Sequence, residues 1–169
     1  MIRLIIRGLV DGALSSLGVV IGASLSNSTA VVLSAGLSGA VANGLSNIMA
    51  AFTAEKTSGY IALNNLEKKM LTSLKGTERE KRIEKEVLRG GAYDGIASII
   101  GGALPVIPFT FMPPSQAVYG SIALVALVAA FLGVYTSMHS KENMLASVVK
   151  MLVFTFVTAG ICISIQFLF

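Results

Sequence analysis

The 169-residue sequence contains no tryptophan, one cysteine and one histidine. The single cysteine, Cys162, excludes a disulfide within the chain and argues against a cysteine-based metal site. The single histidine, His139, excludes a zinc or non-haem iron site built from several histidines of one chain. Charged residues make up only 13% of the chain, where a soluble domain has roughly a quarter. These shortages point away from soluble metalloproteins and disulfide-bonded scaffolds.

Long apolar runs take the place of the missing charges. Hydrophobic residues make up 54% of the chain, and its mean hydropathy is +0.77. A helix needs about 20 predominantly apolar residues to cross the hydrocarbon core of a bilayer. The sequence therefore predicts an all-α membrane protein with five transmembrane helices. The five runs cover residues 8–25, 29–54, 91–111, 116–138 and 146–168.

Lysine and arginine are distributed unevenly among the connections between these runs. The connections 24–29 and 110–116 contain neither, whereas the N-terminus, segment 55–90 and the last connection do. If the runs cross a membrane in turn, every basic side chain falls on one side, which the positive-inside rule assigns to the cytoplasm. We therefore expect a multi-pass protein with its N-terminus inside and its C-terminus outside. The net charge of +4 then reflects the membrane and not nucleic acid.

Segment 55–90 is the one strongly charged stretch, with nine Lys or Arg and six Glu. Its apolar residues recur at helical spacing, Gly76 is expected to end one helix, and Thr77 to cap the next with Glu80 as capping-box partner. We predict a cytoplasmic helical insert between helices two and three. The chain then divides into 1–55 (helices one and two), 56–90 (the insert) and 91–169 (helices three to five).

The insert carries acids that have two possible roles. Several carboxylates on adjacent helices could gather a divalent cation. Alternatively they form a solvated face that pairs with neighbouring basic residues, as Glu78 could with Arg82. The candidates are Glu67, Glu78, Glu80, Glu84 and Glu86.

A short pattern occurs twice, 83 residues apart. "GLVDGALSSLG" at 8–18 and "GAYDGIASIIG" at 91–101 share five identities in eleven positions, all Gly, Asp or Ser. Because both stretches enter from the cytoplasmic side, the pattern predicts a parallel internal repeat of helices one and three. It also places Asp11 and Asp94 in otherwise apolar surroundings. An acid in the hydrocarbon costs about 2.5–3.5 kcal/mol and is a functional candidate by default. The alternative is that each acid complements the dipole at a helix N-terminus.

Helix two provides polar groups that could face these acids. Asn43, Asn47 and Glu55 follow one stripe at helical spacing, with Met49 close to it. The asparagines could simply form hydrogen bonds between helices. Together with the acids they could instead line a passage, and a mixed oxygen and sulfur ligand set suits a cation such as Fe²⁺ or Mn²⁺.

Four stretches together resemble the vacuolar iron transporter family, as a short prokaryotic member. They are "DGALSSLGVVIGA", "AEKTSG" at the end of a long second span, the Glu-rich insert, and "YDGIASIIGGALPVIPF". The resemblance covers nearly the whole chain. It implies a homodimer in the prokaryotic cell membrane that exports divalent iron or manganese in exchange for protons, with no permanently bound cofactor. It also implies that Asp11, Glu55 and Met49 line a path near the two-fold axis, and that the insert glutamates collect metal.

A second class of function is a membrane scaffold or sensor that transports nothing. Its basic arm would lie on anionic lipid, because lysine and arginine near the inner leaflet bind such surfaces. An intramembrane enzyme is not favoured, since the sequence has neither a nucleophile–base pair nor an HExxH motif.

Overall fold

The computed structural model describes residues 2–140 and 143–168, and this part of the chain is helical without a strand. The prediction of an all-α membrane protein with five spans is confirmed, because each of the five α-helices is long and apolar enough to cross a bilayer. The helices are α1 (Ile2–Ala23), α2 (Thr29–Met70), α3 (Glu78–Ala103), α4 (Pro114–Ser140) and α5 (Met144–Gln166), with 3-10 segments η1 (Ser24–Ser26) and η2 (Leu104–Thr110).

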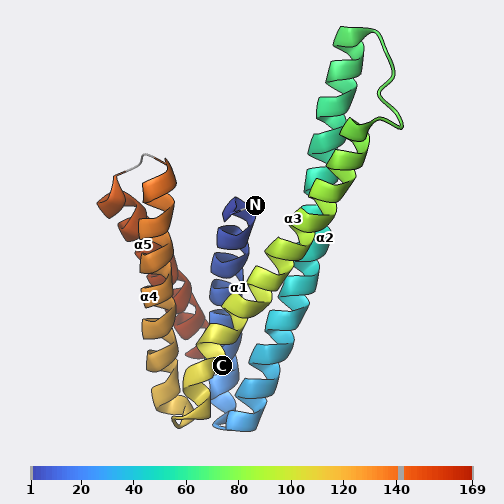
Figure 1. Ribbon diagram of the computed structural model, residues 1–169. Helices are drawn as coiled ribbons and strands as arrows, with labels where there is room; N and C mark the ends of the chain where they lie inside the picture. The colour runs from blue at the N-terminus through green and yellow to red at the C-terminus, as the bar shows by residue number, and fades with distance from the viewer. Residues whose placement is uncertain (1, 141–142, 169) are drawn as a thin grey trace.

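Helices α2 and α3 extend well beyond the other three and form a protruding arm (Figure 1). The 42 residues of α2 correspond to about 63 Å, twice the thickness of a bilayer core. The sequence placed the end of the first arm helix at Gly76, and this was wrong: α2 ends at Met70, where Leu71 takes a left-handed conformation with φ 53°. Gly76, with φ +76°, instead lies in the turn that leads to Thr77, the residue before α3.

The prolines end the third span as expected. The α-helical part of α3 stops at Ala103, and Pro105 and Pro108 both lie in η2. Here the chain reverses toward α4, which begins at Pro114.

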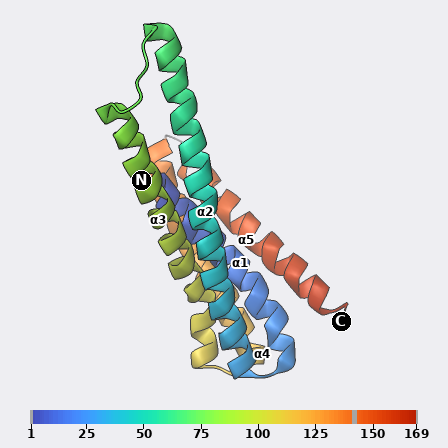
Figure 2. The same ribbon diagram turned by 90° about the vertical axis from the view of Figure 1, so that its right-hand side faces the viewer.

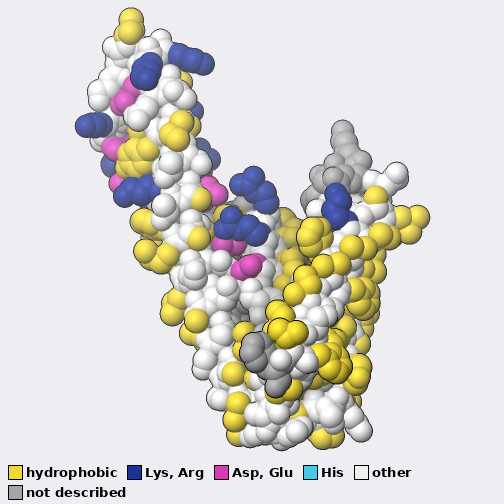
Figure 3. All heavy atoms as spheres, turned by 180° about the vertical axis from the view of Figure 1, so that it is seen from behind, with side chains coloured by type: hydrophobic (Ala, Val, Ile, Leu, Met, Phe, Trp, Pro, Cys, Tyr) yellow, Lys and Arg dark blue, Asp and Glu magenta, His cyan; other side chains and the backbone are white. Residues whose placement is uncertain are grey.

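The helices are arranged around α1, with α2 and α3 on one side and α4 and α5 on the other (Figures 1 and 2). The apolar core lies where α1, α4 and η2 meet, and it contains Leu17, Ile21, Phe109 and Val125. On the face shown in Figure 3, basic and acidic side chains gather on the arm and at the adjoining end of the bundle. The remaining surface of that face is hydrophobic or uncharged.

Glycines bring α1 and α3 into direct backbone contact. A Cβ atom on Gly8 would lie 2.2 Å from the carbonyl oxygen of Asp94, and one on Gly12 would lie 2.0 Å from that of Ser98. Gly101 approaches the backbone of Leu9 in the same way, at 2.3 Å. Close approach through small residues is how helices associate in lipid. Three of the repeated glycines therefore form the contact between the two helices, while a symmetry between the helices stays a prediction.

Gly12→Ala is expected to destabilise the protein, because the methyl group would meet backbone that cannot move aside without shifting α3. Overpacking of this kind costs about 1–3 kcal/mol. Gly22→Ala is the matched control in the same helix, since nothing lies within 4 Å of its Cβ position. That change should be neutral or stabilising by about 0.5–1 kcal/mol. Thermal unfolding in detergent, followed by circular dichroism, measures both. Equal melting temperatures for the two variants would contradict this packing.

Candidate functional site

The candidate site lies along the seam between α1, α2 and α3. Arg3, Arg7 and Asp11 are spaced four residues apart, so they share one face of α1. Each of the three side chains contacts a different polar group on α2 or α3.

Asp11 lies deepest along α1 and is held by two amides. Its Oδ2 atom accepts hydrogen bonds from Nδ2 of Asn43 at 2.8 Å and from Nδ2 of Asn47 at 2.7 Å. Asn43 also donates to Oγ of Ser98 on α3, at 3.0 Å. The three helices thus meet in one network, and both hydrogen bonds to the carboxylate come from neutral groups.

Asp94 has a different environment, although the sequence pattern around it is the same. Its side chain is fully buried, and both of its oxygens bind the Arg7 guanidinium, with Nε 3.2 Å from Oδ1 and Nη2 on Oδ2. The Arg7 side chain is 53% exposed. The negative charge of Asp94 is therefore balanced by a cation on the neighbouring helix.

Glu55 lies nearest the arm and is partly exposed. Its carboxylate is 3.8 Å from the Arg3 guanidinium, which is almost fully exposed. Its Cγ atom packs against α3, 3.6 Å from where a Cβ of Gly90 would be. Glu55 therefore lies at the α2–α3 contact, at the end of the seam where the exposed Arg3 side chain lies.

These positions bear on two of the alternatives left by the sequence. Neither Asp11 nor Asp94 is in the first turn of its helix, because α1 begins at Ile2 and α3 at Glu78. The helix-dipole explanation for them is therefore wrong. Asn43 and Asn47 do form hydrogen bonds between helices, and their partner is Asp11. An amide that rotates by half a turn exchanges its nitrogen for its oxygen, so either asparagine could turn an oxygen toward a cation on Asp11.

Met49 is not brought to this seam within one chain. It is 66% exposed and lines a shallow surface groove of α2 with Ser46, Ala50 and Thr53. On a helical projection this face is opposite to the one that carries Asn43 and Asn47.

The arm glutamates are mostly engaged with neighbouring groups. Glu67 accepts from the Leu74 amide at 2.6 Å, and Glu80 accepts from the Gly76 amide at 2.7 Å and from the Tyr60 hydroxyl at 3.4 Å, so both brace the turn. Among the side chains that the structure describes, which leave out residues 139–142, no three His, Cys, Asp or Glu are grouped so that they could hold a metal ion.

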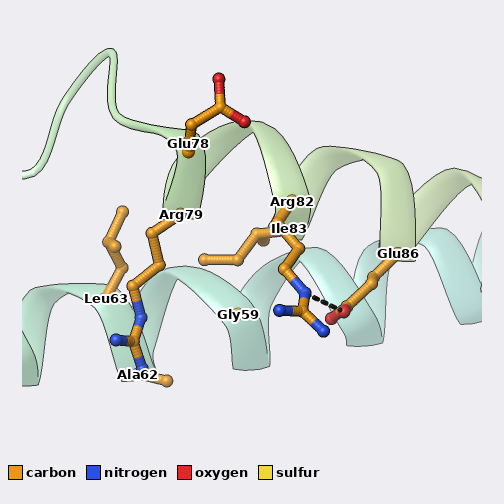
Figure 4. A pocket seen from close by; sticks show the side chains of 8 residues that line it. All are labelled: Gly59, Ala62, Leu63, Glu78, Arg79, Arg82, Ile83 and Glu86. Atoms are coloured by element: carbon orange, nitrogen blue, oxygen red, sulfur yellow. Dashed lines mark hydrogen bonds and ion pairs between the residues drawn. The ribbon is translucent and has the colours of Figure 1, made fainter.

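Glu78 and Glu86 border a cleft of about 670 Å³ between α2 and α3, with Leu63 and Ile83 among its lining residues (Figure 4). Glu86 pairs with Arg82 at 3.0 Å and Glu78 with Lys81 at 3.3 Å, which differs from the Glu78–Arg82 pair that the sequence suggested. Glu84 is exposed. This arrangement matches a solvated face with ion pairs, while metal collection by these residues stays a prediction.

Sequence reasoning missed two members of the seam. Arg7 was counted only as a basic residue of the N-terminus, although its position four residues before Asp11 was a signal that it shares the face of that acid. Ser98 was seen only as part of the repeat, and its repeat partner Ser15 is exposed. The two serines of the repeat therefore have different environments.

The spans, with a charged and amide-lined seam inside them, define a multi-pass helical membrane protein with polar groups buried between its helices. The model of the VIT family matches residues 62–166. The chain is also 43% identical over 167 residues to an uncharacterised protein of Methanocaldococcus jannaschii, covering 97% of this chain and 87% of that protein. The chain belongs to the VIT (vacuolar iron transporter) family, as its sequence indicated. This is a family of membrane transporters of metal ions and not of enzymes.

Asp11→Asn is expected to leave the stability of the metal-free protein unchanged or to raise it. The new asparagine side chain keeps the shape of the aspartate and an oxygen that can accept hydrogen bonds from Asn43 and Asn47. It also removes a charge inside the membrane that only neutral donors stabilise. Asp94→Asn is the matched comparison and should lower stability by about 1–3 kcal/mol, because Arg7 loses a charged partner. Thermal unfolding of the two variants in the same detergent measures this. A clear loss for Asp11→Asn would mean that the network is primarily structural.

Proposed function

We propose that the protein carries a divalent transition metal, Fe²⁺ or Mn²⁺, out of the cytosol in exchange for protons. The observation that carries the proposal is the state of Asp11. This carboxylate lies inside a membrane-spanning helix, and both of its hydrogen bonds come from amides. The carboxylate is therefore available to an incoming cation. Asn43 and Asn47 can each add an oxygen ligand if the side-chain amide rotates.

Exchange with protons follows from the same carboxylate chemistry. A carboxylate binds metal only when it is deprotonated, so binding of the metal and of a proton exclude each other. An acid that passes alternately to the two sides would return with a proton after releasing the metal. Glu55, at the end of the seam near the arm, is the second acid on this route.

A second copy of the chain would complete the ligand set. Asp11 and Glu55 of one chain provide fewer oxygens than a divalent cation normally takes, and a two-fold axis would double the set. The outer face of α2 offers a surface for a second copy, because it exposes large apolar side chains, which are Leu37, Val41, Leu45 and Met49. Met49 would lie at that interface, on the face of α2 opposite to the one that carries Asn43 and Asn47.

The orientation follows from the charge distribution. With the arm and the N-terminus on the cytoplasmic side of a prokaryotic cell membrane and the C-terminus outside, the basic side chains face the side that the positive-inside rule requires. The arm would then stand in the cytosol, where its glutamates could collect metal if their present pairs open.

Transport is tested with the purified protein in liposomes. We expect Mn²⁺ uptake driven by a pH gradient and accompanied by proton counterflow. Asp11→Asn and Glu55→Gln should each reduce its rate at least about tenfold, since each removes a charged ligand. Thr158→Val on α5 is the control, because its hydroxyl donates to the carbonyl of Phe154 on its own helix, and it should transport at the wild-type rate. Absence of uptake by the wild-type protein would favour the scaffold instead.

The dimer is tested by crosslinking in native membranes. Met49→Cys in a Cys162→Ala background should form a disulfide-linked dimer on mild oxidation, because a residue at a two-fold axis meets its own copy. Phe156→Cys on α5 is the matched control, since this side chain is exposed to a similar degree, 56% against 66%. Crosslinking at position 156 and not at position 49 would place the interface elsewhere.

A further inference from the structure

The two aspartates on the seam differ in their partners. Asp11 binds amides, and Asp94 binds the Arg7 guanidinium. Arg7 precedes Asp11 by four residues on the same helix, a spacing at which an arginine and an aspartate side chain can reach each other. Arg7 therefore has two carboxylates within reach and is held by one of them.

Packing explains why Arg7 is held by Asp94. The carbonyl of Asp94 lies against Gly8, where a Cβ would be only 2.2 Å away, so the backbones of α1 and α3 are in direct contact at this level. Gly8 is the residue directly after Arg7. The backbone of Arg7 therefore lies close to Asp94, and the guanidinium can reach the Asp94 side chain. Two parallel bonds to a buried carboxylate make the strongest type of pair that arginine forms.

We propose that Asp94 is a positioning residue that holds the Arg7 guanidinium away from Asp11 and so keeps Asp11 available for a divalent cation. This inference rests on the function proposed above. If Asp94 no longer accepts the guanidinium, Arg7 turns to Asp11 and becomes a tethered competitor of the metal. A group on a short flexible tether has an effective concentration in the millimolar range, so Arg7 would compete with the metal for Asp11.

The test compares Asp94→Asn with the double variant R7Q/D94N in the liposome assay, with Mn²⁺ as the ion. Asp94→Asn should raise the KM for Mn²⁺ at least about tenfold. A tethered competitor lowers the apparent affinity for the metal by a factor that grows with the ratio of its effective concentration to its own dissociation constant. Removing the competitor in R7Q/D94N should return KM to within about twofold of wild type. Arg82→Gln breaks a different arginine–carboxylate pair, on the arm, and should leave KM unchanged.

Two further measurements keep the outcome clear. Asp94→Ser, alone and with Arg7→Gln, is the second pair of variants, because Ser98 shows that a buried serine fits at the same α1–α3 contact one turn further along. Mn²⁺ binding to the detergent-solubilised protein should follow the same pattern as KM. A purely structural role for Asp94 would lower the melting temperature of the single variants and leave KM and metal affinity unchanged.

The possible results separate this inference from the proposed function. If the wild type transports Mn²⁺ and Asp94→Asn has the same KM, the inference is wrong and the transport function stands. If R7Q/D94N keeps the high KM of Asp94→Asn, Asp94 is itself a metal ligand and the inference is also wrong. If the wild type neither transports nor binds Mn²⁺, both proposals fail together.

Discussion

The constraint on which the rest of the structure depends is the direct contact of the α1 and α3 backbones. It is possible only because glycines stand at positions such as 8, 12 and 101, where any side chain would collide with a carbonyl group. In lipid no hydrophobic effect drives helices together, so close packing and interhelical hydrogen bonds must do so. The same contact sets the positions of the charged groups, because Arg7 is the residue next to Gly8, and Asp94 provides the carbonyl that Gly8 meets.

Charges inside the spans are balanced to different degrees along this contact. Asp94 is fully buried and paired with Arg7, which makes it tolerable at a depth where an unpaired carboxylate is costly. Asp11 instead accepts hydrogen bonds from the amides of Asn43 and Asn47. A charged group that lowers the stability of a protein in this way is commonly a functional residue. Asp11 is therefore the centre of the proposed metal path, and Asp94 its support.

The arm and the bundle differ in how their acids are used. On the arm, Glu67 and Glu80 brace the turn between α2 and α3, and Glu78 and Glu86 pair with nearby basic residues in water. Pairs of this kind are screened and contribute little energy, so they can open at small cost. On the seam, Asp94 is buried and Asp11 is part-buried between the helices, and each has a defined partner on a neighbouring helix. This contrast is why the seam, and not the arm, is the stronger candidate for a site.

The sequence by itself determined the spans, the prolines that end α3 and the position of the arm, because hydrophobic run length, proline and charge act locally or through the bilayer as a solvent. It also marked Asp11, Asn43, Asn47, Asp94 and Glu55 as polar groups out of place in apolar surroundings. Only the tertiary structure decided the partners. The repeat suggested equal roles for the two aspartates, yet α2 lies against one and Arg7 against the other. Met49 shares a stretch of sequence with Asn47 but lies on the opposite face. The hydrogen-bond and ion-pair partners of these side chains lie about 30 to 90 residues away in the sequence. Which of them meet depends on which helix faces pack together, and no local sequence pattern contains that information.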